Sequence, residues 1–572
     1  MHRRLAYLPR IGLLAAVGAA LPSLLGCLDH PLKPVEYDKA QEESQTVDLA
    51  VNKDVDILFV IDNSGSMGEE QGTLAANFSN FISVLEQEDV AANYRIGITT
   101  TDNGNPQCNG TTPEGGKLRL SSCRSRESEF TFTGTNPPTV KYDEACAAVC
   151  PDTLANLETV PTATDNDPDP KSRAWIENIE GQTNLPDGVT TTQAFQCFGP
   201  QGINGCGFES PLESMWKSLL LMEQSNSPNF DFRRPNAILG VVIVTDEADC
   251  SLDPDYGTIF DPNGSRTFWS DPNSNFPTSA VCWNAGVKCE GGPGTYTSCD
   301  PVNKDADGNE GVSDDKAVLF PLSKYIDLLQ SIENDQQDRV PGQQVIVAGI
   351  VGVPDGYSDP TDIEYKDSSD QQFQNDFGIG PGCTSTAGTA VPPVRIRDFA
   401  QAFEVSIDGQ VQPNLFSICN DDYSNALQTI ANIIASQVKP ACMQQCVADT
   451  DPSTDNYVEP LCSVEELVPG ENGVERRPIP ACVLTCGGTP CTLPGQNPDG
   501  WEFPTDATAC YRLLVDKNGV TGTDLDDMSQ ECIDDGWNLE FKLERSAAAP
   551  GGTTVQATCQ LSQAQELDCP DL

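Results

Sequence analysis

Residues 56–68 read DILFVIDNSGSMG, an apolar run of strand length that ends in a loop rich in acidic and hydroxyl side chains. A continuous apolar run of this length is typical of a strand that is buried on both faces, as in a parallel sheet. The loop has the pattern Asp62-x-Ser64-x-Ser66, and Gly65 permits a tight turn within it. Apolar residues then recur at helical spacing, at Leu74, Phe78, Phe81, Ile82 and Leu85. The stretch therefore predicts a buried strand, a polar loop and a helix in succession.

The alternation of strand and helix continues to about residue 440. Further strand-length apolar runs lie at 94–100, 237–244, 345–351 and 415–418, and segments with helical spacing lie at 212–220, 322–329, 396–403 and 427–438. Strands that alternate with helices indicate a parallel sheet covered on both faces. We expect an α/β domain over residues 54–440. Its doubly wound, mostly parallel sheet would be Rossmann-like, with two long insertions at about 102–205 and 250–315.

The cysteines divide the chain into two parts. The sequence has 23 cysteines; apart from Cys27, 12 lie between Cys108 and Cys419 and 10 lie between Cys442 and Cys569. Exported chains pair their cysteines, and both subsets are even. We therefore expect disulfides within each subset and a domain boundary near residue 440, although spacing alone does not give the connectivity.

The amino-acid composition of the chain changes at that boundary. Over residues 441–572 the apolar runs shorten, and Pro, Gly and Cys dominate. Residues 538–544 alternate between apolar and polar side chains, as a half-buried strand does. This segment is expected to be a small, Cys-rich, mostly β domain that is stapled by disulfides.

The first 26 residues have the features of an export signal. Three arginines precede an apolar run over residues 11–25, which ends in Leu24-Leu25-Gly26-Cys27. That tetrad resembles a bacterial lipobox, which implies cleavage before Cys27 and lipid on its side chain; the alternative is an ordinary signal peptide with an incidental cysteine. Residues 27–53 would then be a tether. Because residue 28 is Leu and not Asp, we expect a lipid-anchored protein of the bacterial envelope, at the outer membrane or cell surface.

Composition excludes several classes of function. The chain has 33 Lys and Arg against 85 Asp and Glu, a net charge of −52, and no basic cluster after residue 10, so nucleic acid is excluded as a partner. His2 and His30 are the two histidines of the sequence. This removes most routes to a Ser–His–Asp or Cys–His hydrolase and to a His-ligated zinc enzyme, so we expect a protein that is not an enzyme.

Two aspartates follow strongly apolar strands. Asp62 ends the first strand, and Asp246 comes directly after the strand at 237–244 and Thr245. In open α/β sheets, ligands bind at the carboxyl ends of the strands. Carboxylates and hydroxyls are the oxygen ligands that Mg²⁺ and Ca²⁺ prefer. The pattern thus predicts one divalent metal site at this edge, with Glu69, Glu70, Asp102 and Glu247 as further acidic residues at its rim.

Over residues 54–438 these features resemble the von Willebrand factor A family. Asp62-x-Ser64-x-Ser66 resembles the metal-ion-dependent adhesion site of that family, and Thr245-Asp246 resembles its later strand-end aspartate. The resemblance implies that Ser64 and Ser66 bind the metal directly, that Asp62 and Asp246 bind it directly or through water, and that an acidic group of the ligand takes the remaining position.

One position departs from the family pattern. The family usually has a Thr just before the middle helix, and here Glu209 falls at that place, followed by Ser210. Either Glu209 adds a carboxylate and favours a more tightly held Ca²⁺, or Ser210 substitutes for the Thr.

A second calcium site is possible in the insertion at 250–315. The spacing follows that of a twelve-residue calcium loop with Gly308 at the sixth position, and the candidate ligands are Asn303, Asp305, Asp307, Asn309 and Asp314. The loop lacks the final Glu, so an acidic surface turn is the alternative.

These sequence features leave three candidate functions. The first is an envelope-anchored adhesion or interaction protein that binds an unknown protein, or another acidic ligand, through the metal. The second is a structural envelope protein whose metal stabilises the fold. The third is a metal-dependent hydrolase, which lacks a histidine for acid–base chemistry in the folded region.

Overall fold

The computed structural model describes most of the chain from residue 44 onward. The described ranges are 44–48, 53–87, 90–438 and 441–572, apart from gaps at 109, 180, 338, 341, 387, 408, 452–457, 471–472, 492–497, 518, 520–521, 547–553 and 571. The expected signal peptide at 1–26 and the lipidation site Cys27 lie outside the described residues.

The apolar run at 56–61 lies in β2 (Asp54–Ile61), which is the central strand of a seven-stranded sheet. The sheet has the order β18-β13-β10-β2-β3-β8-β9. Its other strands are β3 (Asn93–Thr100), β8 (Trp175–Ile179), β9 (Gln182–Thr183), β10 (Ile238–Val244), β13 (Ile346–Val351) and β18 (Leu415–Ser417). The five strands from β18 to β3 are parallel to one another. β8 pairs antiparallel with β3, and β9 pairs antiparallel with β8. The expected mostly parallel sheet is confirmed.

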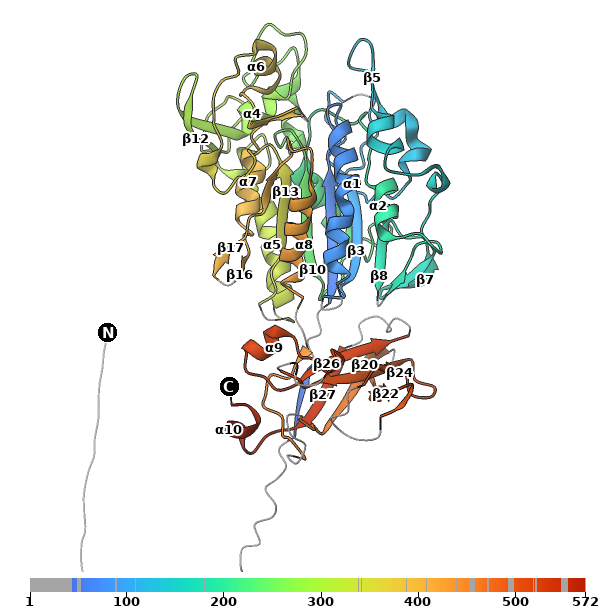
Figure 1. Cartoon of the computed structure of the whole chain (residues 1–572). Coiled ribbons are helices and arrows are strands. Elements are labelled where there is room, and N and C mark those ends of the chain that lie inside the picture. Colours follow the sequence, from blue (N-terminus) through green and yellow to red (C-terminus); the bar gives the residue numbers. More distant parts are fainter. Residues whose placement is uncertain are drawn as a thin grey trace, which may run out of the picture. The chain divides into compact units, whose positions relative to one another are not determined.

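Helices cover both faces of this sheet (Figure 1). One face packs against α1 (Gly68–Leu85), α2 (Thr191–Phe198) and α8 (Ser424–Ala435), and the other packs against α3 (Pro211–Met222), α5 (Leu322–Gln337) and α7 (Val394–Gln401). Successive side chains of β2 alternate between the two faces, as a pleated strand requires: Phe59 belongs to the first and Leu58 to the second. A continuous apolar run is the sequence signature of a strand covered in this way.

Four aromatic rings form the centre of the first face. Phe59 from β2 meets the rings of Phe78, Phe81 and Phe195 at centroid distances of 6.0, 5.8 and 5.2 Å. Phe195, on α2 in the first insertion, stacks on Phe78 at 3.5 Å. The insertion is therefore part of the main core, and it also supplies β8 and β9 to the sheet.

Inserted segments also lie beyond the upper end of the sheet in Figure 1, which shows α4, α6 and β12 on one side and β5 on the other. These elements are β5 (Thr139–Val140), α4 (Ala280–Gly286), β11 (Val287–Gly291), β12 (Tyr296–Pro301) and α6 (Gln371–Phe377). Short turns η1 (Cys123–Phe130), η2 (Asp143–Ala147), η4 (Pro254–Phe260) and η6 (Pro360–Asp362), with strands β4 (Thr131–Phe132), β6 (Thr162–Thr164) and β7 (Asp167–Lys171), complete these insertions.

Eleven disulfides hold these segments, and they join all the cysteines that follow Cys27. Six lie in the α/β domain: Cys108–Cys206, Cys123–Cys146, Cys150–Cys197, Cys250–Cys282, Cys289–Cys299 and Cys383–Cys419. Five lie after residue 440: Cys442–Cys532, Cys446–Cys569, Cys462–Cys559, Cys482–Cys510 and Cys486–Cys491. The predicted pairing within each subset is confirmed, and the closely spaced cysteines 197 and 206 belong to two longer bridges.

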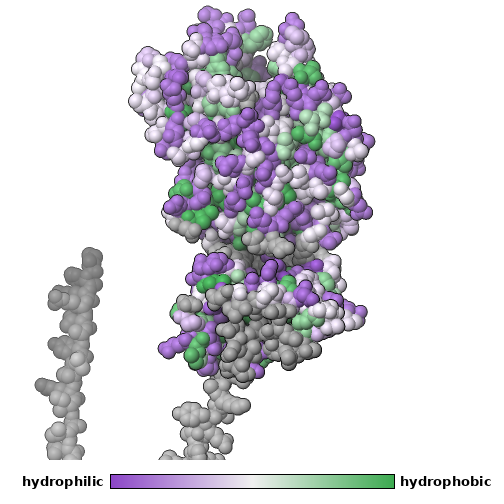
Figure 2. All heavy atoms as spheres, viewed as in Figure 1, coloured by the Kyte–Doolittle hydropathy of each residue, from purple (hydrophilic) through white to green (hydrophobic). Residues whose placement is uncertain are grey.

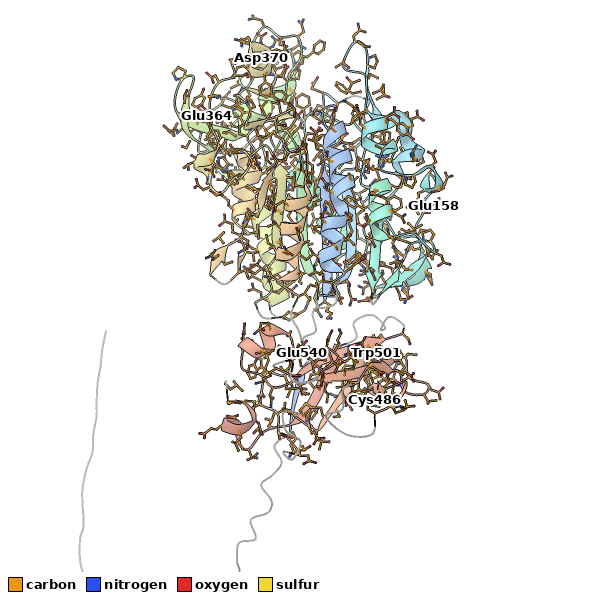
Figure 3. All side chains as sticks on the ribbon, in the orientation of Figure 1. Glu158, Glu364, Asp370, Cys486, Trp501 and Glu540 are labelled. Atoms are coloured by element: carbon orange, nitrogen blue, oxygen red, sulfur yellow. A yellow bond between two sulfur atoms is a disulfide. The ribbon has the colours of Figure 1, made fainter. Side chains whose placement is uncertain are left out.

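The chain after residue 440 is built mainly from short antiparallel strands. They are β19 (Ala441–Cys442), β20 (Cys462–Gly470), β21 (Gly473–Ile479), β22 (Val483–Cys486), β23 (Thr489–Pro490), β24 (Gly500–Glu502), β25 (Ala509–Leu514), β26 (Glu540–Arg545) and β27 (Thr554–Gln560), with short helices α9 (Gln530–Asp534) and α10 (Gln565–Asp568). The surface seen in Figure 2 is mostly hydrophilic, with scattered hydrophobic residues. Figure 3 shows Cys486 and Trp501 close together on the paired strands β22 and β24.

A strand from the opposite end of the chain completes one of these sheets. β1 (Ser44–Asp48) pairs antiparallel with β27, from Ser44 opposite Gln560 to Asp48 opposite Gln556. The resulting sheet has the order β1-β27-β20-β21. Part of the segment expected to be a plain tether is thus a strand. None of the described helices combines the length and the apolar character that crossing a membrane requires.

Replacing Phe195 by Ala should destabilise the whole α/β domain. The change removes a fully buried ring that contacts Phe59 and Phe78, so the free energy of unfolding should fall by about 3–5 kcal/mol. Urea unfolding followed by circular dichroism measures the loss. Phe276→Ala removes a ring that is 73% exposed and should change stability by no more than about 0.5 kcal/mol. A loss below about 1 kcal/mol for Phe195→Ala would show that the insertion folds apart from the core.

Candidate metal centre

The strand register places Asp62 and Asp246 at the same edge of the sheet. Ile61 pairs with Val244 at the ends of the neighbouring parallel strands β2 and β10. The chain runs from β2 outward to β3 on one side, and from β10 outward to β13 on the other, so the two strands flank the switch point of the sheet. Asp62 N donates to Val244 O at 2.9 Å, which fixes the first residue of the loop to the neighbouring strand.

Hydrogen bonds orient the Asp62 carboxylate. Its Oδ1 accepts from Ser64 N at 2.7 Å, and its Oδ2 accepts from Thr245 Oγ1 at 2.5 Å. Gln71 on α1 donates from Nε2 to Asp62 O at 2.7 Å. Residues from the loop, the neighbouring strand end and the following helix therefore hold one fully buried carboxylate in place.

The two serines of the motif lie together beside the second aspartate. Ser64 Oγ and Ser66 Oγ are 3.2 Å apart, and Ser66 hydrogen-bonds the Asp246 carboxylate. Gly65, between them, faces the ring of Phe132 in the first insertion: a Cβ there would lie 2.8 Å from the ring. Glycine lets this insertion close over the turn of the loop.

Glu209 and Ser210 differ in what they can offer a metal. Ser210 Oγ donates to Cys250 O at 2.7 Å, and so it is engaged in holding the start of α3. Glu209 is fully buried; its Oε2 accepts from Thr101 Oγ1, whereas its Oε1 has no hydrogen-bond partner among the described residues. Of the two alternatives left open by the sequence, Glu209 has the free ligand atom.

Four buried carboxylates at this edge each have one oxygen without a hydrogen-bond partner among the described residues. The oxygens without a hydrogen-bond partner in the described part of the chain are Glu70 Oε2, Glu209 Oε1, Asp246 Oδ1 and Glu247 Oε2. Buried polar atoms are nearly always paired, so four such oxygens at one strand edge indicate that a cation belongs there.

The four acidic residues predicted at the rim of the site differ in burial and in hydrogen bonding. Glu70 and Glu247 are 7% and 9% exposed, so they are part of the buried cluster and not a solvated rim. Asp102 is buried too, but its oxygens accept from Gly104 N and Cys206 N. Glu69 is half-exposed and pairs with Lys141. The sequence signal for Glu70 and Glu247 is their position next to the motif residues, which does not reveal their burial.

Burial raises the pKa of every carboxylate in this cluster, and repulsion raises that of all but Asp62 further. Burial raises the pKa of Asp62 to about 6. Burial and the nearby negative charge of Asp62 raise the pKa of Glu70 to about 7 and that of Glu247 to about 8. The same causes hold the pKa of Glu209 and of Asp246 well above the ordinary range. A divalent cation would relieve this repulsion, because it lets the carboxylates keep their charge.

The donor set fits a hard cation such as Mg²⁺ or Ca²⁺. Asp62, Ser64, Ser66, Asp246 and Glu209 offer only oxygen atoms. Within the described ranges, the one group of three carboxylates whose ligand atoms all lie within 4.8 Å of one another is elsewhere, at Asp516, Asp526 and Asp527. At the strand edge, Asp62, Asp246 and Glu209 do not all come that close to one another, so no more than two of these carboxylates would bind the ion directly and the third would act through water, with the hydroxyls of Ser64 and Ser66 completing the set.

The expected calcium loop at 303–314 is held by its own polar groups. Asp305 Oδ1 accepts from Asp307 N at 3.1 Å and from Asn309 N at 2.9 Å. Asn303 Nδ2 donates to Asp314 Oδ1 at 2.9 Å. The three aspartates of this loop do not converge into a group of the kind found at Asp516. These contacts occur within the loop itself, and the second calcium site stays a prediction.

The arrangement at the strand edge matches what the family resemblance implies. An Asp-x-Ser-x-Ser loop follows the central parallel strand, a helix follows the loop, and a second aspartate follows the neighbouring strand. The α/β domain has a von Willebrand factor A-like fold.

Comparisons with known proteins give limited further information. No family model matches the sequence, and no curated protein matches it. Solved structures that are similar include the pilus adhesin SpaC from Lactobacillus rhamnosus GG, with 8% identity, a TM-score of 0.27 and coverage of 90% of this chain and 40% of that chain. A von Willebrand factor type A protein from Catenulispora acidiphila has 9% identity, a TM-score of 0.23 and coverage of 91% and 65%. The pilus adhesin RrgA from Streptococcus pneumoniae has 8% identity, a TM-score of 0.22 and coverage of 91% and 58%. This chain spans less than two thirds of each of them, and likenesses this low carry no argument about what it binds.

In the absence of divalent ions, the protein should lose stability as pH rises from about 4 to 8. Unfolded carboxyl groups titrate near pH 4, whereas Asp62, Glu70 and Glu247 titrate in the folded protein at about 6, 7 and 8. Between these limits the folded state retains protons that the unfolded state has released, so deprotonation favours unfolding.

Thermal melts in chelator at pH 5, 6, 7 and 8 measure this dependence. The melting temperature should fall along the series, and added Mg²⁺ or Ca²⁺ should restore most of the loss at pH 8. A melting temperature that is constant or rises over this range would contradict the clustering of these carboxylates.

Proposed function

We propose that this chain is an envelope-anchored lipoprotein that binds a protein through a divalent metal centre formed by Asp62, Ser64, Ser66, Asp246 and Glu209. The observation that carries the proposal is a set of four buried carboxylates at the switch point of a parallel sheet, each with one oxygen that has no hydrogen-bond partner among the described residues. Ligands bind at such switch points in open α/β sheets.

The residues around the ion would have separate roles. When bound, the ion supplies a positive charge that attracts an acidic group of the partner. Thr245 and the backbone of Ser64 hold the Asp62 carboxylate in one orientation. Thr101 holds Glu209, so that its Oε1 stays free. Gln71 donates to the carbonyl oxygens of Asp62 and Gly202, at 2.7 and 2.8 Å, and so ties the motif to the insertion.

Glu209 should also influence which ion is held. A carboxylate in place of a neutral hydroxyl adds negative charge, and Ca²⁺ accepts more oxygen ligands than Mg²⁺ does. We therefore favour Ca²⁺ as the tightly held ion, with Mg²⁺ as the alternative. Competition between the two ions in the wild type and in Glu209→Thr measures this preference.

Asp246→Ala should abolish the response to divalent ions and leave the fold intact. In the wild type, an ion that binds only the folded state raises the free energy of unfolding by about 2.7 kcal/mol at a hundredfold excess over Kd. Melting curves with and without Mg²⁺ or Ca²⁺ measure the effect. Glu158→Gln removes an exposed carboxylate that belongs to neither candidate metal site and should respond as the wild type does. A wild type without any thermal response, or an Asp246→Ala variant that responds fully, would show that these residues do not form the metal centre.

The same variant separates binding from a purely structural role. If the centre binds a partner, envelope proteins should co-purify with the wild type in Mg²⁺ or Ca²⁺, should be released by chelator, and should be absent with Asp246→Ala. If the ion only stabilises the fold, capture should not depend on divalent ions. Hydrolysis of a general panel of phosphoester and peptide substrates would favour the enzyme alternative.

The anchor is proposed from the sequence around Cys27. Cys27→Ala should leave the protein either uncleaved by the lipoprotein signal peptidase or free of the membrane, because the lipid-bearing residue is lost. Membrane fractionation and mass measurement of the expressed protein test this. A Cys27→Ala protein that stays membrane-bound at mature size would exclude the lipid anchor.

A further inference from the structure

A polar pocket lies next to the metal centre and is built from inserted segments. It has a volume of about 190 Å³. One side comes from the insertion at 250–315 and includes Trp269, Asp271, Phe276 and Thr278, and the other side comes from α6 and includes Asp376. Figure 1 shows α4 and α6 beyond the upper end of the sheet, and Figure 3 labels Asp370, which caps the start of α6, in the same region.

A direct contact joins the wall of the pocket to the segment that carries Glu209. Thr278 lines the pocket, and the hydroxyl of its neighbour Ser279 donates to Gly207 O at 2.9 Å, two residues before Glu209. Thr278 Oγ1 donates to Asn375 O at 2.8 Å, which ties the two walls together. A ligand bound at the ion would therefore have the pocket beside it.

The pocket holds carboxylates without a cationic partner. In the described part of the chain, no Lys or Arg forms an ion pair with Asp271 or Asp376. Asp376 accepts from Gln372 Nε2 at 2.9 Å, and Asp271 accepts from Asn273 N at 2.8 Å. The contacts that these two carboxylates make are with neutral donors.

Aromatic rings complete the lining. Phe276 is 73% exposed, which is unusual for a ring of this size in a chain so rich in acidic residues. Arg266 lies over the ring of Trp269 at 4.8 Å, but its guanidinium donates to the carbonyl oxygens of Pro262 and Pro272 and not to the pocket carboxylates. Rings beside carboxylates are the surroundings that guanidinium and ammonium groups prefer.

The size of the pocket limits its occupant. An open pocket of about 190 Å³ has room for one long side chain and not for a folded segment. We propose that this pocket binds a basic side chain, Arg in preference to Lys, of the polypeptide whose acidic group binds the ion. The inference rests on the proposed metal-dependent binding, and it defines the partner as a segment that carries an acidic and a basic residue close together.

Binding of N-acetyl-arginine amide, measured by ligand-observed NMR in chelator, tests the pocket independently of the ion. N-acetyl-citrulline amide has nearly the same shape without the charge and is the matched probe. The wild type should bind the arginine compound about tenfold more tightly than the citrulline compound. Asp271→Asn/Asp376→Asn should lose that preference. Glu158→Gln/Asp169→Asn, which removes two exposed charges elsewhere, should keep it.

Equal binding of the two compounds by the wild type, or an unchanged preference in Asp271→Asn/Asp376→Asn, would overturn the proposal. Because the probe is measured without divalent ions, failure of the pocket is distinct from failure of the metal centre, which Asp246→Ala reports. The proposal is supported if Asp271→Asn/Asp376→Asn loses the preference for the arginine compound and Glu158→Gln/Asp169→Asn keeps it. Loss of the preference in both variants would overturn the proposal, because it would show a general effect of net charge.

Discussion

Repulsion between buried carboxylates is the constraint on which this structure depends. The pairing of β2 with β10 brings Asp62 and Asp246 to one strand edge, and Glu70, Glu209 and Glu247 lie close enough to raise the pKa values of the cluster further. Several like charges in a low-dielectric site cost several kcal/mol unless they are paired or protonated. The cluster persists because the surrounding structure leaves the carboxylates no other position.

The structure around the carboxylates is apolar and is held together by disulfides. The two strands that carry the aspartates are buried along nearly their whole length, between two helical layers. The loop is tied to the first insertion through Gln71, and the cover over Gly65 comes from Phe132 of the same insertion. Cys108–Cys206 and Cys250–Cys282 close the chain on either side of Glu209. Hydrophobic burial and disulfides thus offset the electrostatic cost at the strand edge.

Sequence patterns predicted the parts of the fold that depend on local order. The apolar run before Asp62 predicted the central strand, and the even number of cysteines on each side of residue 440 predicted separate pairing. Contacts between distant residues left no such pattern. Nothing near Phe195 indicates that its ring stacks on Phe78, and nothing near Ser44 indicates that it pairs with Gln560. The burial of Glu247 left no pattern in the sequence either.

The strand β1 also has a mechanical consequence. If the chain is held at Cys27, as proposed, a pull on a ligand at the ion would be transmitted to the membrane through the 36 residues from Cys27 to Asp62. This path contains β1 and β2 but no disulfide, because every bridge joins cysteines at position 108 or later. Force would therefore be resisted by the hydrogen bonds of β2 to its two parallel neighbours and by those of β1 to β27. The bridged domain after residue 440 lies outside this covalent path and would be loaded only through the ladder between β1 and β27.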